Sequence, residues 1–488
     1  MQLPIAVIIA VVVSVGPIII WGGGANPQLL GDFAQPWGAP WALVTAGVLA
    51  ALIFILPLCW MLVWRTLDLI ALALAQSGLL MLGYYFLDIT AFHIENAGSV
   101  IVRQGGTVLL INSVGFALLF LSMVVTYTIT MVSRARLRPL IAPPEAYDVR
   151  LRPLLYVMGG CALLVIALPM PVTGTIPMLA ADPMAARYQM LSSDVTRAFY
   201  NLGTAVLPFI VGGLLTGIFR EPRRLFGLDG WLAGSIVVVQ ILSGQRLPIA
   251  VTMLVAATLI SLERKWPRWL VFAAFIAYLF MFTGVSGFTA ILRKDRSVLS
   301  QGNVLKQSLD EAFLGDNLID LRDAAWVFGY WDKQPLMGTT YLGGLVAMVP
   351  SGIFPQKHEW HLGLTGIRIV GWDPEKHFGI RITFFGESYL NFGWAGVMGF
   401  AVIMGCLFGT LLRQLHLLSL KRPPCLVKNL RTVMLMQMCL PLSNTSDAFT
   451  FWSMCVILLA MWVWIDLPVR LAATAQARAK LPLGSSHA

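Results

Sequence analysis

The stretch from His377 to Gly399, HFGIRITFFGESYLNFGWAGVMG, carries charged and polar side chains at the point where a strongly apolar segment begins. Arg381, Glu387 and Asn391 stand at its start. A charged side chain near hydrocarbon is costly, so such groups usually face a cavity or a partner. Residues four apart on a helix point the same way, which pairs Glu387 with Asn391. These residues therefore indicate a polar site at the membrane boundary.

Two roles for Glu387 are consistent with this pattern. A carboxylate in a water-poor site can take a proton from a sugar hydroxyl and act as a general base. Alternatively, the carboxylate pairs with an arginine and only orients it. The sequence does not decide between them.

Arginines stand at several further positions that the topology below places on the same side of the membrane. Arg246 lies in SGQRLPIA, at a tight break between two apolar segments, and Arg187 and Arg197 precede another such segment. A guanidinium offers phosphate a planar fork of donors and stays charged. Several arginines that converge would suit a lipid-linked diphosphate. The alternative for each is an interfacial anchor or an ion-pair partner.

The histidines of one polar segment form no recognisable metal site. His358 and His361 belong to HEWH, whereas a zincin helix needs H-E-x-x-H. None of the six cysteines forms a pair with zinc-type spacing. We therefore expect neither a metal nor another cofactor, and His377, nearest to the apolar segment, is the histidine with a candidate role.

The composition predicts an integral membrane protein. Of the 488 residues 58% are hydrophobic and only 12% are charged, and the mean hydropathy is +0.77. Soluble domains carry about 25% charged residues. The net charge of +10 is explained by the Lys and Arg that cytoplasmic loops collect, so nucleic-acid binding is not expected.

A membrane-spanning helix needs about 20 mostly apolar residues. Twelve segments qualify, which predicts an all-α polytopic protein with about twelve transmembrane helices: 3–21, 41–64, 67–87, 107–132, 153–171, 203–219, 229–243, 247–262, 268–285, 391–412, 430–442 and 449–466. The first lacks the basic start and cleavage site of a signal peptide, so we expect it to be retained.

The basic residues predict the orientation. With both termini in the cytoplasm, twenty Lys and Arg fall in inner segments and four in short outer loops, and the other ten lie in one long outer segment. We expect a transmembrane bundle over 1–285 and a long outer loop over 286–390. C-terminal spans and a cytoplasmic tail follow over 391–488. Within the loop, NLIDLRDAAWVFGYW predicts an amphipathic helix, and GTTYLGGLVAMVPSGIFP a re-entrant or interfacial segment.

Part of the chain resembles the Wzy-type O-antigen polymerases, which join oligosaccharide repeat units. The resemblance lies in GDNLIDLRDAAWVFGYWDKQPLMGTTYLGGLVAMVPSGIFPQK, in GESYLNFGWAGVMGFAVIMG, and in GQR at 244–246, about a quarter of the chain. It implies a metal-independent glycosyltransferase of the membrane-embedded type C class in the bacterial inner membrane, active on the periplasmic face. The donor and acceptor would be undecaprenyl-diphosphate-linked oligosaccharides. The glycan would leave its lipid diphosphate when a hydroxyl of the incoming unit attacks.

The resemblance also implies roles for the residues named above. Arg246, Arg187 and Arg381 would hold the diphosphate and offset charge on the leaving group. Glu387, or alternatively His377, would act on the acceptor hydroxyl. Further substrate contacts would come from Arg197, Asp316, Arg322, Asp323, Tyr341, Arg368, Tyr389 and Asn391; Arg368 and Gly379 match an Arg-x10-Gly pattern described for the family.

Two other functions are compatible with the sequence. An O-antigen ligase would transfer the glycan to lipid A-core and is expected to depend on a periplasmic histidine, which a His377→Ala variant tests. A transporter or flippase of lipid-linked sugars would usually carry internal repeats and polar residues in mid-span, and neither is evident here. Membrane lipids are expected partners; whether a chain-length regulator or a flippase also binds is left open.

Overall fold

A computed structural model describes most of the chain between residues 39 and 436. The described ranges are 39–86, 98–132, 146–180, 183–243, 247–280, 319–346, 352–373 and 380–421, with the single residues 349, 433, 435 and 436. Every regular element in these ranges is an α-helix or a 3-10 helix. The all-helical class predicted from the sequence is therefore confirmed for the described part of the chain.

Among the described residues, five helices are long and apolar enough to cross a membrane, by their length and composition. They cover Ala42–Trp64, Leu69–Phe86, Gln104–Thr130, Arg152–Thr173 and Phe384–Leu417, and three shorter apolar helices cover Val206–Leu215, Leu228–Leu242 and Arg268–Phe280. These helices indicate a membrane-embedded protein. The count of twelve spans stays a prediction, because the segments at 3–21 and 449–466 and most of 430–442 lie outside the described residues.

The chain divides into two compact units. Unit 2 contains α6, α7, η3, α8, α9, η4, α10 and the start of α11: Ala146–Ala167, Pro169–Thr173, Pro177–Leu179, Pro183–Met190, Asp194–Arg220, Pro222–Phe226, Leu228–Leu242 and Leu247–Arg264. Its core is built by α6, α9 and α10, with Ile166, Tyr200, Leu207 and Ile236 fully buried. The predicted segment at 203–219 lies within α9. The segment at 153–171 lies within α6 and α7 apart from Leu168 between them, and the segment at 229–243 lies within α10 apart from Ser243.

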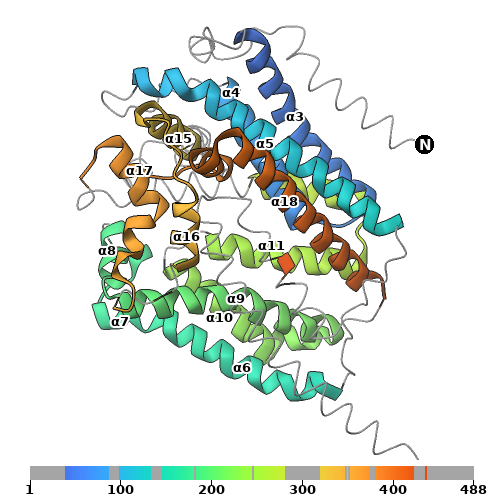
Figure 1. The fold of residues 1–488 in the computed structure, drawn as a ribbon. Coiled ribbons are helices and arrows are strands. Elements are labelled where there is room, and N and C mark those ends of the chain that lie inside the picture. Colours follow the sequence, from blue (N-terminus) through green and yellow to red (C-terminus); the bar gives the residue numbers. More distant parts are fainter. Residues whose placement is uncertain are drawn as a thin grey trace, which may run out of the picture. The chain divides into compact units, whose positions relative to one another are not determined.

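Unit 1 contains the other helices and the end of α11. They are α3, α4, α5, α12, α15, α16, η7, α17 and α18: Ala39–Trp64, Leu69–Phe86, Gly98–Val132, Arg268–Phe280, Ile319–Tyr330, Thr339–Val346, Pro355–Trp360, Leu362–Val370 and Phe384–Lys421; the unit ends at His416. In Figure 1, α3, α4 and α5 lie together, and α5 packs against both of its neighbours and against α15.

The helix α5 connects the two ends of unit 1. Near its start, Val100 touches Gly329 of α15, and near its end Tyr127 hydrogen-bonds to His416 of α18. The 27 residues between Val100 and Tyr127 correspond to about 40 Å of helix, more than the ~30 Å hydrocarbon core of a bilayer. The helices of the predicted outer loop therefore lie at one end of the unit, and the end of α18 lies at the other.

The segment predicted to be an amphipathic helix forms α15, but its burial is not limited to one face. Leu321, Ala325 and Phe328 are buried as predicted, and Ala324 and Val327 are buried too. The physical reason is that α15 packs against both α5 and α17, so most of its circumference is covered.

The segment predicted to be re-entrant or interfacial contains the eight-residue helix α16. Thr340, Gly343 and Gly344 are buried on it, whereas Leu342 and Leu345 are half exposed. A helix of eight residues is about 12 Å long and cannot cross a bilayer.

A bend at Gly393 divides α18 into a short arm, 384–392, and a long arm, 394–421. Gly393 has φ 61° and ψ −150°, a conformation that is open almost only to glycine. The bend returns the short arm onto the long one, since the rings of Phe384 and Phe400 lie 5.0 Å apart. Residues 384–392 therefore turn their polar side chains toward the loop helices instead of continuing the span.

We expect a Gly393→Ala variant to lose about 2 kcal/mol of stability, because a Cβ makes this backbone conformation unfavourable. A Cβ at Gly393 would meet no atom within 4 Å, so the loss is conformational and not a clash. Thermal unfolding of the purified protein in detergent measures it. An unchanged melting temperature would contradict the bend as a glycine-dependent feature.

Candidate active site

The short arm of α18 presents three buried polar side chains, Glu387, Ser388 and Asn391. Glu387 and Asn391 do share one face, as their spacing predicts, and both contact Thr340 of α16. The Thr340 hydroxyl donates to Glu387 Oε1 at 2.7 Å and accepts from Asn391 Nδ2, also at 2.7 Å. Asn391 Nδ2 donates in addition to the carbonyl of Glu387, at 2.9 Å. A buried threonine thus joins a carboxylate and an amide into one network.

The same arm holds the chain segment that leads into α16. The amide N–H of Gly338 donates to Asn391 Oδ1 at 2.8 Å, and the N–H groups of Leu336 and Met337 donate to the carbonyls of Leu390 and Asn391. The Asn391 side chain therefore satisfies the buried N–H of Gly338, which would cost about 1–3 kcal/mol without a partner.

Tyr341 extends this network by one hydrogen bond. Its hydroxyl donates to Ser388 Oγ at 2.9 Å, and its ring stacks on Phe400 of the long arm, with the centroids 5.5 Å apart. Burial, followed by the nearby Glu387 carboxylate, raises the pKa of Tyr341 well above its ordinary value. The hydroxyl therefore stays protonated and acts as a donor at all physiological pH values.

A second polar group lies where α15 meets the chain just before α18. Arg322 pairs with Asp323 at 3.2 Å, and Arg381 lies 3.9 Å from Asp320. Burial raises the pKa of the Asp323 carboxyl, although Arg322 and Arg381 both lower it. The Arg381 side chain is 65% exposed, against 20% for Asp320, so its guanidinium projects from the protein.

A cluster of aromatic rings connects α15 and the residue that follows it with α18. Tyr389 contacts Phe328 at 5.4 Å, Trp331 at 5.9 Å and Trp394 at 5.8 Å, measured between ring centroids. Tyr389 therefore stands on the short arm as one member of an aromatic cluster.

Of the other residues proposed from the sequence, the structure describes Arg368, Arg187 and Arg197. Arg368 is exposed at the end of α17 and donates to the carbonyl of Glu359. Arg187 is half-buried on α8 and Arg197 lies in α9, both in unit 2. Arg246, Asp316 and His377 lie outside the described residues, so the expected meeting of Arg246 with Glu387 stays a prediction.

The second histidine of the HEWH motif, His361, caps a helix. His361 precedes α17, and its Nδ1 accepts from the amide N–H of Gly363 at 3.2 Å, as an N-cap. Within the described ranges, no three His, Cys, Asp or Glu side chains come together as metal ligands.

Sequence reasoning missed Thr340, the central member of the network. The only signal for it is the pair of threonines in GTTY, and nothing in the sequence shows which of the two is buried. No family model, curated protein or solved structure matches the chain.

Proposed function

We propose that this protein is a membrane-embedded glycosyltransferase of the bacterial inner membrane. It would polymerise undecaprenyl-diphosphate-linked repeat units into O-antigen or exopolysaccharide on the periplasmic face. The observation that carries the proposal is the exposed Arg381 guanidinium beside Asp320, three residues before the α18 short arm that carries the buried network. The described parts of the segments that resemble the family contain α15, α16 and parts of η7 and α18.

Arg381 suits a diphosphate for two reasons. Its guanidinium is largely exposed, so a ligand can reach its donors. Its partner Asp320 lies 3.9 Å away, beyond the length of a direct hydrogen bond, so the donors of the fork are not consumed by a short ion pair. As the bond from the sugar C1 to the phosphate oxygen breaks, this cation would offset the charge that gathers on the leaving diphosphate.

Glu387 acts as a positioning residue in this proposal. It is buried and bonded to Thr340, which favours the role of orienting its surroundings over that of meeting a sugar hydroxyl. The acceptor oxygen forms the new bond to C1 and gives its proton to a base, for which His377 remains the candidate. Asp323, Arg322, Tyr341 and Asn391 would support the sugar site through the contacts described above.

Polymerisation by the purified protein tests the proposal. In nanodiscs with a synthetic undecaprenyl-diphosphate repeat unit, the wild type should give a ladder of polymer on undecaprenyl diphosphate. Arg381→Ala should lower the rate about 100-fold, the effect typical of losing one charge-stabilising donor. Arg381→Lys should fall between the two, since lysine keeps the charge and loses the fork.

Arg268→Ala is the matched control. Arg268 is an exposed arginine at the start of α12, on the side predicted to be cytoplasmic, so its loss should leave the rate unchanged. Equal rates for Arg381→Ala and wild type would remove Arg381 from the site. Transfer of the glycan to lipid A-core would identify a ligase instead, and transport of the lipid-linked sugar without polymer a transporter.

A further inference from the structure

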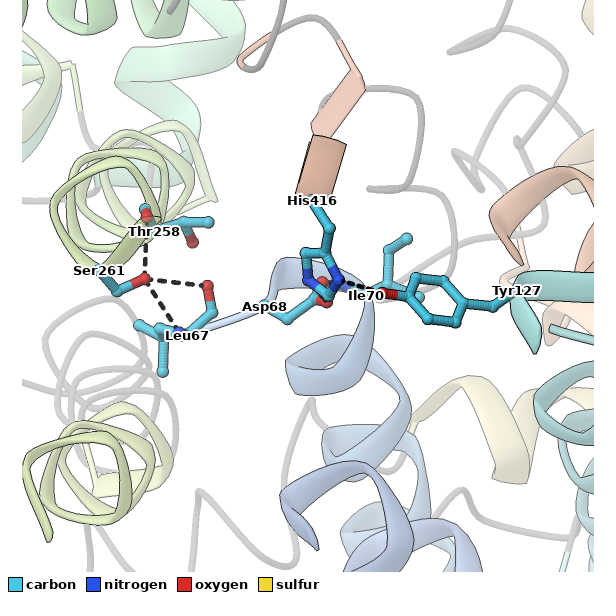
Figure 2. A network of polar contacts seen from close by, with 7 residues as sticks. All are labelled: Leu67, Asp68, Ile70, Tyr127, Thr258, Ser261 and His416. Carbon is cyan, nitrogen blue, oxygen red and sulfur yellow. Dashed lines mark hydrogen bonds and ion pairs between the residues drawn. The ribbon is translucent and has the colours of Figure 1, made fainter. Parts of the chain in front are cut away.

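A second buried polar cluster lies at the other end of unit 1 and has no part in the proposed glycosyl transfer. Asp68, just before α4, points toward Tyr127 of α5 and His416 of α18, as Figure 2 shows. Their exposed fractions are only 4%, 2% and 3%. Ionisable side chains buried in a membrane protein are expensive and mark a functional site by default.

Asp68 precedes α4 and uses only one carboxylate oxygen locally. Its Oδ1 accepts from the amide N–H of Ile70 at 3.1 Å, as an N-cap does. Its Oδ2 is buried and makes no hydrogen bond in the described part of the chain. The Oδ2 atom lies 3.9 Å from His416 Nε2, about 1 Å beyond hydrogen-bond distance.

His416 links this carboxylate to a tyrosine. Its other ring nitrogen, Nδ1, lies 2.8 Å from Tyr127 Oη. The rings of Trp60 and Trp64 enclose the pair: Trp60 lies 4.8 Å from Tyr127, and Trp64 lies 4.8 Å from His416. The aromatic wall separates the three groups from their surroundings.

The chain around Asp68 is fixed by α11. Ser261 Oγ accepts from the amide N–H of Leu67 at 2.9 Å and donates to the carbonyl of Thr258 at 2.8 Å, as seen on the left of Figure 2. The backbone next to Asp68 is therefore held in place, so the side chains of Asp68 and His416 must rotate to close the 3.9 Å gap between them.

The charged groups near the cluster are few among the described residues. On α18, the Arg413 guanidinium lies 6.0 Å from the centre of the Tyr127 ring, where it would offset negative charge on the phenol oxygen. Arg65 and Lys265 follow α3 and α11 and are exposed. Trp60, Trp64, Thr258 and Ser261 do not titrate in the physiological range.

We propose that Asp68, His416 and Tyr127 form a proton relay that stores one proton on Asp68. With Asp68 ionised, His416 carries its proton on Nε2, and the Tyr127 hydroxyl donates to Nδ1. The Nε2 proton moves to Asp68 Oδ2 while the Tyr127 proton moves to Nδ1. An incoming proton then replaces the one that Tyr127 gave up, so the net change is one proton gained by Asp68.

The electrostatics of Asp68 fit this assignment. Burial raises the pKa of its carboxyl from an ordinary 3.8 to about 7, despite hydrogen bonds that lower it. Both protonation states of Asp68 would therefore be populated near neutral pH. Exposed carboxyls titrate about 3 pH units lower.

A purely structural role for Asp68, as the N-cap of α4, makes a different prediction. Asparagine caps helices as well as aspartate does, so Asp68→Asn keeps the cap and removes only the titration. Infrared difference spectroscopy of the full chain in nanodiscs, between about pH 5 and about pH 9, detects the C=O stretch of a protonated carboxylic acid. The wild type should show a band with a midpoint near neutral pH that Asp68→Asn lacks.

Asp323, whose pKa is also raised, contributes equally to the spectra of the wild type and of Asp68→Asn. Its signal therefore cancels when one spectrum is subtracted from the other. A band of the same size and midpoint in Asp68→Asn, or no band in either protein, would overturn the proposal.

The free energy of unfolding gives a second readout, which does not require the infrared band to be assigned. Through Asp68 the folded state binds more protons than the unfolded chain between about pH 4 and pH 7. The free energy of unfolding of the wild type minus that of Asp68→Asn should therefore fall as pH rises through this window and be level above it.

The relay itself is tested by rates. After a rapid drop in pH, Tyr127→Phe should slow the appearance of the acid band about 100-fold, as loss of a positioned proton donor does, without changing its final size. His416→Gln should act in the same way. Tyr278→Phe is the control, since Tyr278 is a buried tyrosine of unit 1 that bonds to Gln76 instead. Wild-type rates in both Tyr127→Phe and His416→Gln would overturn the relay.

Discussion

Replacing Thr340 with valine is expected to destabilise unit 1 by about 3 kcal/mol. Valine keeps the shape of threonine but removes its hydroxyl, which donates to Glu387 and accepts from Asn391, both at 2.7 Å. A hydrogen bond to a charged group is worth about 1.5–3 kcal/mol, and buried groups that lose a partner add to the loss. Thermal unfolding in detergent measures the change.

The neighbouring threonine supplies the matched control. Thr339 is exposed, and its hydroxyl donates only to the carbonyl of Leu336, three residues earlier. Thr339→Val should therefore change stability by about 0.5 kcal/mol or less. Under the proposed function, Thr340→Val should also abolish most polymerisation, because α16 is no longer held against the short arm. Equal stability of the two variants would show that the Thr340 network is unimportant.

Replacing Gly409 with alanine should cost about as much, through packing instead of hydrogen bonding. A Cβ at this position would lie 2.5 Å from the carbonyl oxygen of Met123 and 2.9 Å from the Cβ of Thr126. Both belong to α5, whose backbone cannot yield without moving the helix. Overpacking typically costs about 1–3 kcal/mol, and we expect about 3 kcal/mol here. The 2.8 Å contact from Tyr127 to His416 should lengthen as well.

Gly399, on the same arm of α18, is the control for this change. A Cβ at Gly399 would meet no atom within 4 Å, and alanine is favoured over glycine in a helix by about 1 kcal/mol. Gly399→Ala should therefore be neutral or slightly stabilising. Melting temperatures of the two variants in the same detergent provide the comparison, and equal losses for both would contradict close packing of α5 and α18.

The sequence was sufficient to locate most of the described helices. Apolar length alone predicted 41–64 and 229–243, and the structure places α3 and α10 within one or two residues of these limits. Glycines three to six residues apart along α18 also favour close packing of helices. That holds for Gly405 and Gly409, which lie against α5, whereas Gly393 instead makes a bend.

The candidate site was predictable only in part. The spacing of Glu387 and Asn391 correctly placed them on one face of a helix, because helical geometry is local. Their shared partner Thr340 is 47 residues from Glu387 along the chain, so no local pattern identifies it. The burial of Glu387, which bears on its two candidate roles, also depends on neighbours that are distant in the sequence.

The sequence by itself determined the membrane-embedded helical class and the approximate limits of helices such as α3 and α10, since the bilayer fixes the length and polarity of a crossing helix. Tertiary structure alone decided which polar side chains meet. Asp68, Tyr127 and His416 are separated by 59 and 289 residues, and each looks like an isolated polar residue beside an apolar run. Helix packing brings them together, because contacts between helices depend on the register at which their faces meet.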